Sequence, residues 1–230
     1  MRRAGITEPE PLQPRNLRTP RAAAVAGIIF SALLITALVL LRLSSPSRAS
    51  ATGAWLSNPR SRGEVAIALN LVPFAGIAFL WFIGVLRDRI GEREDRFFAT
   101  VFLGSGLLFV AMLFVAAAVA GATIAAAGSR LPGADVLVLS RNVTGSLLNV
   151  YAMRMAAVFT LTTVNIARHT QIVSRWLIYA GLACAVALLI GIGISPWVEL
   201  LFPAWILALS LEILVAGGRP SAAPAGEHHP

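Results

Sequence analysis

Long apolar stretches, nearly free of charge, occupy most of this chain of 230 residues. Each reaches or approaches the roughly 20 apolar residues that a helix needs to cross the hydrocarbon core of a bilayer. Lipid offers the backbone no hydrogen-bond partners, so stretches of this kind must be helices packed in a bundle. We therefore predict an all-α polytopic membrane protein, a helical bundle with about six transmembrane helices. The predicted spans are residues 22–41, 65–86, 98–127, 147–167, 176–194 and 197–216.

The composition agrees with a membrane protein, since 57% of the residues are hydrophobic and only 13% are charged. A soluble chain of this length needs more polar residues to cover its surface. The formal net charge of +8 reflects 19 basic residues, all of them arginines. These arginines lie between and beside the apolar stretches, where they set membrane orientation and contact phospholipid headgroups. We therefore expect membrane lipids, and no nucleic acid, among the partners.

The arginines also indicate how the chain is oriented. If the N-terminus lies inside, the cytoplasmic segments contain twelve arginines and the outer segments six, as the positive-inside rule requires. Residues 1–21 and 217–230 are then disordered cytoplasmic tails, and residues 22–216 form the transmembrane domain. The absence of lysine, with abundant alanine and arginine, is typical of GC-rich bacterial genomes and indicates the bacterial plasma membrane. The first span is longer than a signal-peptide core, although the small residues at 49–51 leave its cleavage open.

Three ionisable residues fall within or near the predicted spans: Arg154, Glu199 and Glu212. Such groups are costly in lipid unless they are paired or hydrated. Counted along the predicted helices at about 1.5 Å per residue, Asn70, Arg154 and Glu199 lie at similar depths in the outer half of the bilayer. We therefore predict an intramembrane polar cluster of these three residues, which either forms a structural ion pair or marks a functional site. Glu212 lies near the inner interface, where a loop arginine or water would pair with it.

Two prolines and a polar helix face support this predicted cluster. Pro73 and Pro203 follow Asn70 and Glu199 by three or four residues, and each would free a backbone carbonyl one turn earlier. Kinked helices beside polar groups are how many transporters build their binding sites. Polar residues also share one face of the fourth predicted helix at about 100° per residue, where they either line a hydrated cavity or join helices. They are Asn142, Ser146, Asn149 and Thr160.

Small residues recur at four-residue spacing on three of the predicted helices. This spacing lets helix backbones approach closely inside a membrane. It predicts helix packing within the chain, with homodimerisation as the alternative. The residues are Gly27 and Ser31 on the first helix, Ala117, Gly121 and Ala125 on the third, and Gly181 and Ala185 on the fifth.

A charged connector separates the second and third predicted spans. Residues 87–96 contain four arginines and four carboxylates, a composition typical of a solvated cytoplasmic loop that also suits docking of a soluble partner. Together with the segment Asn-Leu-Val-Pro-Phe-Ala-Gly at 70–76, this loop resembles segments of uncharacterised multi-pass integral membrane proteins of GC-rich bacteria. The similarity covers residues 64–115 and implies a membrane protein, with no activity or site attached to it.

Residue types exclude several chemistries. Without lysine, neither a Schiff base nor a phosphate-loop lysine can form. The sequence contains no pattern for a catalytic residue, a cofactor or a metal ion, so we expect no enzymatic activity. Two functions remain open. The chain is either an accessory or scaffold protein that binds a partner or a second copy through helix faces or the 87–96 loop, or a small transporter or permease component with an Arg154-centred site for an anionic solute.

Overall fold

The computed structural model describes residues 19–44, 58–90, 96–129, 133–170, 173–191, 195 and 197–216. Its regular elements are all helices, which confirms the predicted all-α class. They are α1 (Thr19–Ser44), α3 (Pro59–Ile90), α4 (Arg96–Ser129), α5 (Ala134–Gly145), the π-helix η1 (Ser146–Ala152), α6 (Met153–Thr170), α7 (Arg175–Ile190), the 3₁₀ turn η2 (Val198–Leu200) and α8 (Leu201–Ala216). The predicted tails, apart from residues 19–21, lie outside the described residues, as do residues 91–95 of the charged loop.

Among the described residues, five helical stretches are long and apolar enough to cross a membrane, by length and composition. They are Arg21–Ser44, Pro59–Arg87, Phe97–Gly128, Ala134–Arg168 and Val198–Ala216. A further stretch, Arg175–Ile190, is apolar but shorter. These stretches correspond to the predicted spans, although their ends differ.

The fourth helical stretch begins before the predicted span of residues 147–167. α5 begins at Ala134 and η1 joins it to α6 without a break, an early start that the sequence already allows at residues 135–139. α5 contains Asp135 and Arg141, which lower its hydropathy without preventing a helix. Hydropathy predicts whether a segment can lie in lipid or in water. Helix formation depends instead on the local helix preference of the chain and does not require lipid.

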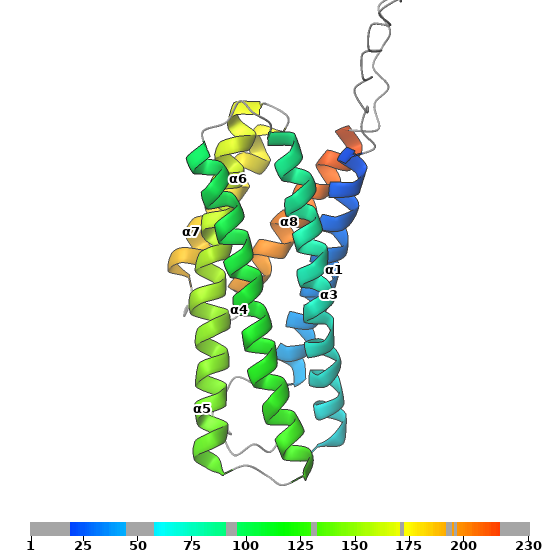
Figure 1. Cartoon of the computed structure of the whole chain (residues 1–230), viewed down its shortest axis with the longest axis vertical. Helices are drawn as coiled ribbons and strands as arrows, with labels where there is room; N and C mark the ends of the chain where they lie inside the picture. The colour runs from blue at the N-terminus through cyan, green and yellow to red at the C-terminus, as the bar shows by residue number, and fades with distance from the viewer. Residues whose placement is uncertain are drawn as a thin grey trace, which may run out of the picture.

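The helices run along one bundle whose two ends differ (Figure 1). At the end that we call proximal, α1, α4 and α7 begin, and α3, α6 and α8 end. At the opposite, distal end, α4 ends and α5 begins. α7 and α8 are each 16 residues long and cover only the proximal part of the bundle. α3, α4 and α5 therefore extend beyond them toward the distal end (Figure 1).

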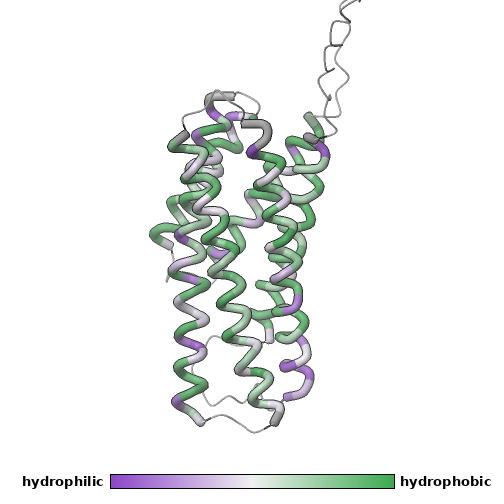
Figure 2. Tube along the Cα trace, viewed as in Figure 1, coloured by the Kyte–Doolittle hydropathy of each residue, from purple (hydrophilic) through white to green (hydrophobic). Residues whose placement is uncertain are grey.

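Apolar residues cover most of the bundle, whereas hydrophilic residues occur along α5 and at the start of α3 (Figure 2). Large apolar side chains also lie on the outside of the bundle. Trp81, Tyr179 and Ile190, for example, are 71%, 68% and 72% exposed. Extensive apolar exposure of this kind is expected for helices that face lipid rather than water.

Five helices each contribute a phenylalanine to the centre of the bundle. Phe30, Phe79, Phe109, Phe159 and Phe202 come from α1, α3, α4, α6 and α8, and all five are fully buried. The ring centroid of Phe79 lies 4.5 Å from that of Phe30, 5.3 Å from that of Phe109 and 5.1 Å from that of Phe159. Aromatic pairs at these separations stabilise a fold beyond their contact area alone. This aromatic core fixes five helices relative to one another and fills the space between them.

Two of the three small-residue motifs pack within the chain. A methyl group added at Gly27 would lie 2.0 Å from Ser210 Oγ on α8. One added at Gly181 would lie 2.6 Å from the Val164 side chain on α6 and 2.8 Å from the Trp205 ring on α8. Glycine therefore allows α1 and α7 to approach their neighbours closely, which confirms intrachain packing at both motifs.

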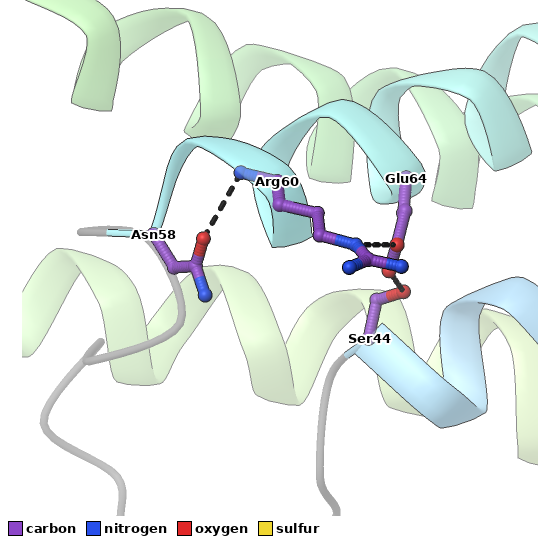
Figure 3. Close-up of polar contacts among 4 residues, drawn as sticks. All are labelled: Ser44, Asn58, Arg60 and Glu64. Atoms are coloured by element: carbon purple, nitrogen blue, oxygen red, sulfur yellow. Dashed lines mark hydrogen bonds and ion pairs between the residues drawn. The ribbon is translucent and has the colours of Figure 1, made fainter.

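A polar network joins the distal end of α1 to the start of α3 (Figure 3). Asn58 Oδ1 accepts a hydrogen bond from the Arg60 backbone N–H at 3.0 Å, and an asparagine here, followed by Pro59, favours helix initiation. Glu64 accepts hydrogen bonds from Arg60 Nε at 3.0 Å and from Ser44 Oγ at 2.7 Å. Because Ser44 is the last residue of α1, the network ties the end of α1 to the start of α3.

Candidate functional site

Glu199 forms an ion pair with Arg42. Glu199 lies in η2, between α7 and α8, and Arg42 lies in the last turn of α1. The side chain of Glu199 is 6% exposed and that of Arg42 is 25% exposed. Arg42 Nη2 donates to Glu199 Oε1, whereas Oε2 is buried and has no hydrogen-bond partner among the described residues. The ion pair therefore fastens the segment between α7 and α8 to the distal end of α1.

The predicted cluster of Asn70, Arg154 and Glu199 is not formed. Arg154, on α6, is exposed and makes no hydrogen bond or ion pair with any described residue. Asn70, on α3, is also exposed, and its Nδ2 donates to the backbone carbonyl of Ala66 at 2.8 Å. Neither side chain is joined to Glu199.

Sequence reasoning missed Arg42 because it treated this residue as part of an outer loop. Depth in the membrane was the one signal that pointed to Arg42. This residue directly follows the first predicted span and therefore lies at nearly the same depth as Glu199. Depth alone does not choose between Arg42 and Arg154 as the partner of Glu199. The packing of α1 against α8 and η2 makes that choice.

The two prolines occupy different kinds of position. Pro73 lies inside α3, so it removes the N–H from which the Leu69 carbonyl would accept a hydrogen bond. Pro203 is the third residue of α8, and its fixed backbone angle suits the first turn of this helix. Because η2 runs directly into α8, the missing N–H of Pro203 leaves the Glu199 carbonyl without a helical donor.

A π-helix breaks the polar face predicted around Asn149. In η1 the Met153 N–H donates to the Leu148 carbonyl, five residues earlier. A π-helical turn contains more residues than an α-helical turn, so the α-helical spacing assumed for this face does not continue through η1. Asn149 is half-buried, whereas Asn142 is exposed and Thr160 is fully buried. These side chains do not form one continuous hydrated face.

Glu212 holds the beginning of α7. Its Oε1 accepts a hydrogen bond from the Ser174 backbone N–H at 2.5 Å, and its Oε2 accepts one from Ser174 Oγ at 2.8 Å. Ser174 is the residue that precedes α7, where unpaired N–H groups and the helix dipole favour a carboxylate. Glu212 therefore binds a serine, and among the described residues it forms no ion pair with the loop arginine expected from the sequence. It joins α8 to α7.

A groove of about 530 Å³ lies between α3 and α4. Its walls include Ala66, Asn70 and Pro73 from α3, and Ala117, Gly121 and Ala125 from α4. The three α4 residues are the remaining small-residue motif. A methyl group added at Gly121 would meet no atom within 4 Å, unlike one added at Gly27 or Gly181. This motif therefore does not pack against another helix of the chain at Gly121, and it lines an open, mainly apolar groove.

Among the described residues, no three His, Cys, Asp or Glu side chains lie together as the ligands of a metal ion would. Comparisons with protein-family models, curated proteins and solved structures find no match. The described part of the chain thus offers a buried ion pair, an aromatic core and an open groove that contains the Asn70 amide. These features suit contacts between helices better than they suit covalent chemistry.

Proposed function

We propose that this chain is an integral membrane accessory or scaffold protein of the bacterial plasma membrane, with six spans and both termini in the cytoplasm. It binds a protein partner through the exposed face of α5. This helix belongs to the distal extension, which we define as residues 59–66 of α3, residues 118–128 of α4, and α5. The resemblance of residues 64–115 to multi-pass membrane proteins belongs to this proposal and adds no activity to it.

Exposed arginines support this placement in the membrane. Four of them lie at helix ends on the proximal side: Arg21, Arg87, Arg168 and Arg175. The positive-inside rule favours the cytoplasm for such an end. A hydrocarbon core of about 30 Å spans about 20 helical residues, and the 16 residues of α7 come close to this length. The far membrane surface then lies near the segment between α7 and α8.

The distal extension projects beyond that surface. α4 contains 34 residues, or about 51 Å of helix, so it exceeds the hydrocarbon core by roughly 20 Å. α5 has no buried residue, and it exposes four large apolar side chains, Val136, Val138, Leu139 and Val143. Apolar side chains that neither lipid nor the rest of the chain covers are typical of a protein-binding surface. This surface is the observation that carries the proposal.

The transporter alternative has less support. Arg154, the centre of its expected site, is exposed and has neither Asn70 nor Glu199 as a partner. The five buried phenylalanines fill the space between α1, α3, α4, α6 and α8, where a solute path between these helices would run. The 87–96 loop is the other partner site expected from the sequence, and its central residues lie outside the described part of the chain.

Photo-crosslinking in cells tests the proposed partner surface. A photoreactive amino acid at Leu139 of α5 should crosslink to a distinct membrane or periplasmic protein, because this side chain is 65% exposed. The matched control is Leu182, which is 43% exposed on α7 and should react with lipid alone. Crosslinks of the same kind from both positions, or none from Leu139, would contradict the proposal.

Cysteine labelling tests the orientation. In a Cys184→Ala background, which removes the chain's one cysteine, Arg87→Cys should react only after the cytoplasmic side is opened. Asp135→Cys should react with a membrane-impermeant maleimide added from outside. Labelling of both positions from the same side would refute the topology, and protection of Asp135→Cys in lipid would refute the projection of α5.

A further inference from the structure

The groove between α3 and α4 combines an apolar surface with an incompletely paired amide. Asn70 lines this groove, and its Nδ2 makes one hydrogen bond, to the Ala66 carbonyl of its own helix. An asparagine amide has two N–H donors and an oxygen that accepts two hydrogen bonds, so most of this capacity is unused within the described part of the chain. Pro73 adds a second acceptor, because it leaves the Leu69 carbonyl without its usual helical donor.

The position of the groove limits what can fill it. Asn70 lies 17 residues from Arg87, or about 25 Å from the proximal end, so in the proposed placement it lies inside the outer part of the hydrocarbon core. A lipid acyl chain at this depth has no donor or acceptor for the amide. The α4 wall continues to Ala125, past the proposed membrane surface, where lipid no longer covers it. The occupant must therefore be apolar, must reach beyond the bilayer and must offer hydrogen-bonding groups at the depth of Asn70.

A second copy of this chain meets all three conditions. Its own α3–α4 face is apolar along the groove, and its α4 extends past the membrane surface by the same length, so neither copy creates a mismatch for the other. Two copies with the same orientation place their Asn70 amides at the same depth. Each amide can then donate to and accept from the other, as paired asparagines do in helical dimers.

The shape of this face is also self-complementary. Ile67 and Phe74 follow the groove residues Ala66 and Pro73 in sequence, and they are 57% and 63% exposed. They form a ridge on α3 beside the groove. A twofold axis brings the ridge of one copy to the groove of the other, and the same contact occurs twice. Small residues on α4 allow the two backbones to approach closely.

We infer that the α3–α4 face is a homodimer interface, in which two parallel copies pair about a twofold axis along the membrane normal and their Asn70 amides bond to each other. This surface is distinct from the exposed face of α5 that we assign to a protein partner, although both assignments use the same membrane placement.

Crosslinking in liposomes tests the interface. In the Cys184→Ala background, Ala118→Cys places a thiol in the groove, and a short bismaleimide should convert the protein to covalent dimers. Leu182→Cys is the matched control, because it is exposed on α7, which packs against α6 and α8 rather than α3 or α4. Dimers at position 182 with none at position 118 would overturn the inference.

Single-molecule photobleaching at decreasing protein-to-lipid ratios measures the association constant. Asn70→Leu should weaken dimerisation about 5- to 30-fold, because interhelical hydrogen bonds of this kind contribute modestly in lipid. Gly121→Leu should weaken it further by filling the groove, whereas Gly104→Leu should change nothing, since it lies on the same helix with open space around it. If Gly121→Leu prevents folding, Asn70→Leu still decides, because its amide bonds only within its own helix.

A wild-type chain that stays monomeric at every ratio, or a dimer that is insensitive to Asn70→Leu, would refute the inference. A different result, the absence of a protein crosslink at Leu139, would refute the proposed function. A monomer that keeps its Leu139 crosslink therefore refutes only the homodimer.

Discussion

Replacing Arg42 by leucine should destabilise the protein more than any other single change of an arginine within a span. Arg42 is the partner of Glu199, whose side chain is 6% exposed. Arg42→Leu would leave this carboxylate buried with neither oxygen paired, because Oε2 already has no partner among the described residues. Removing one member of a buried ion pair costs about 3–5 kcal/mol, and we expect the free energy of unfolding to fall by about 3 kcal/mol or more.

The opposite change should cost less. After Glu199→Leu, Arg42 is still 25% exposed, and its long side chain can carry the guanidinium toward the membrane surface. We therefore expect a loss of about 1–2 kcal/mol for Glu199→Leu. Replacing both residues by leucine removes both charges, so the double variant should lie within about 1 kcal/mol of the wild type. Arg154→Leu should change stability by less than about 0.5 kcal/mol, since Arg154 is exposed and has no partner among the described residues.

Unfolding by sodium dodecyl sulfate in mixed micelles, followed by tryptophan fluorescence, measures these four variants against the wild type. The comparison of the stability losses of Arg42→Leu and Glu199→Leu is the most discriminating result, because it depends on the unequal burial of the two partners. If Arg42→Leu costs no more than Glu199→Leu, or if Arg154→Leu is the more damaging change, the ion pair described here is not what holds Glu199.

Three further outcomes are expected from the same titration or from hydrogen exchange. Phe79→Ala should lower stability by about 3–5 kcal/mol, because it opens a cavity among rings from four other helices; Phe97→Ala, at a residue that is 64% exposed, is the control and should cost much less. Gly181→Ala should cost about 1–3 kcal/mol through overpacking, whereas Gly84→Ala, with no atom within 4 Å, should cost nothing; equal effects would contradict the close helix contact. Glu212→Ala should cost about 1–2 kcal/mol and speed amide exchange in the first turn of α7, and unchanged exchange there would show that the carboxylate does not hold this helix end.

Much of the fold can be predicted from the sequence, because the cues that specify it are local. An apolar stretch of sufficient length must become a helix in lipid whatever surrounds it, so the predicted spans recur among the described helices. The spacing of small residues on α1 and α7 likewise predicts close packing, because a small side chain allows close approach whichever helix is the neighbour. The start of the fourth helix is less well defined by the sequence, because the charged residues of α5 remove the hydropathy signal without opposing a helix.

The candidate site could be predicted only in part. Glu199 was recognised as a buried charge that needs a partner, and Asn70 as a polar residue inside a span. The neighbours of Glu199 and Asn70 could not be predicted, because depth along the membrane normal is a single coordinate and several residues lie at the same depth. The π-helix at Ser146–Ala152 changes which side chains share a face, and a regular α-helical count cannot include it.

The sequence alone therefore determines that the chain is a bundle of apolar helices, since the solvent acts on each segment separately. The tertiary structure decides that Arg42 rather than Arg154 meets Glu199, and that Gly121 lines an open groove while Gly27 and Gly181 are covered. These choices depend on which helices are neighbours. The packing of all the helices around the aromatic core decides which helices are neighbours, and the sequence of no single segment contains that information.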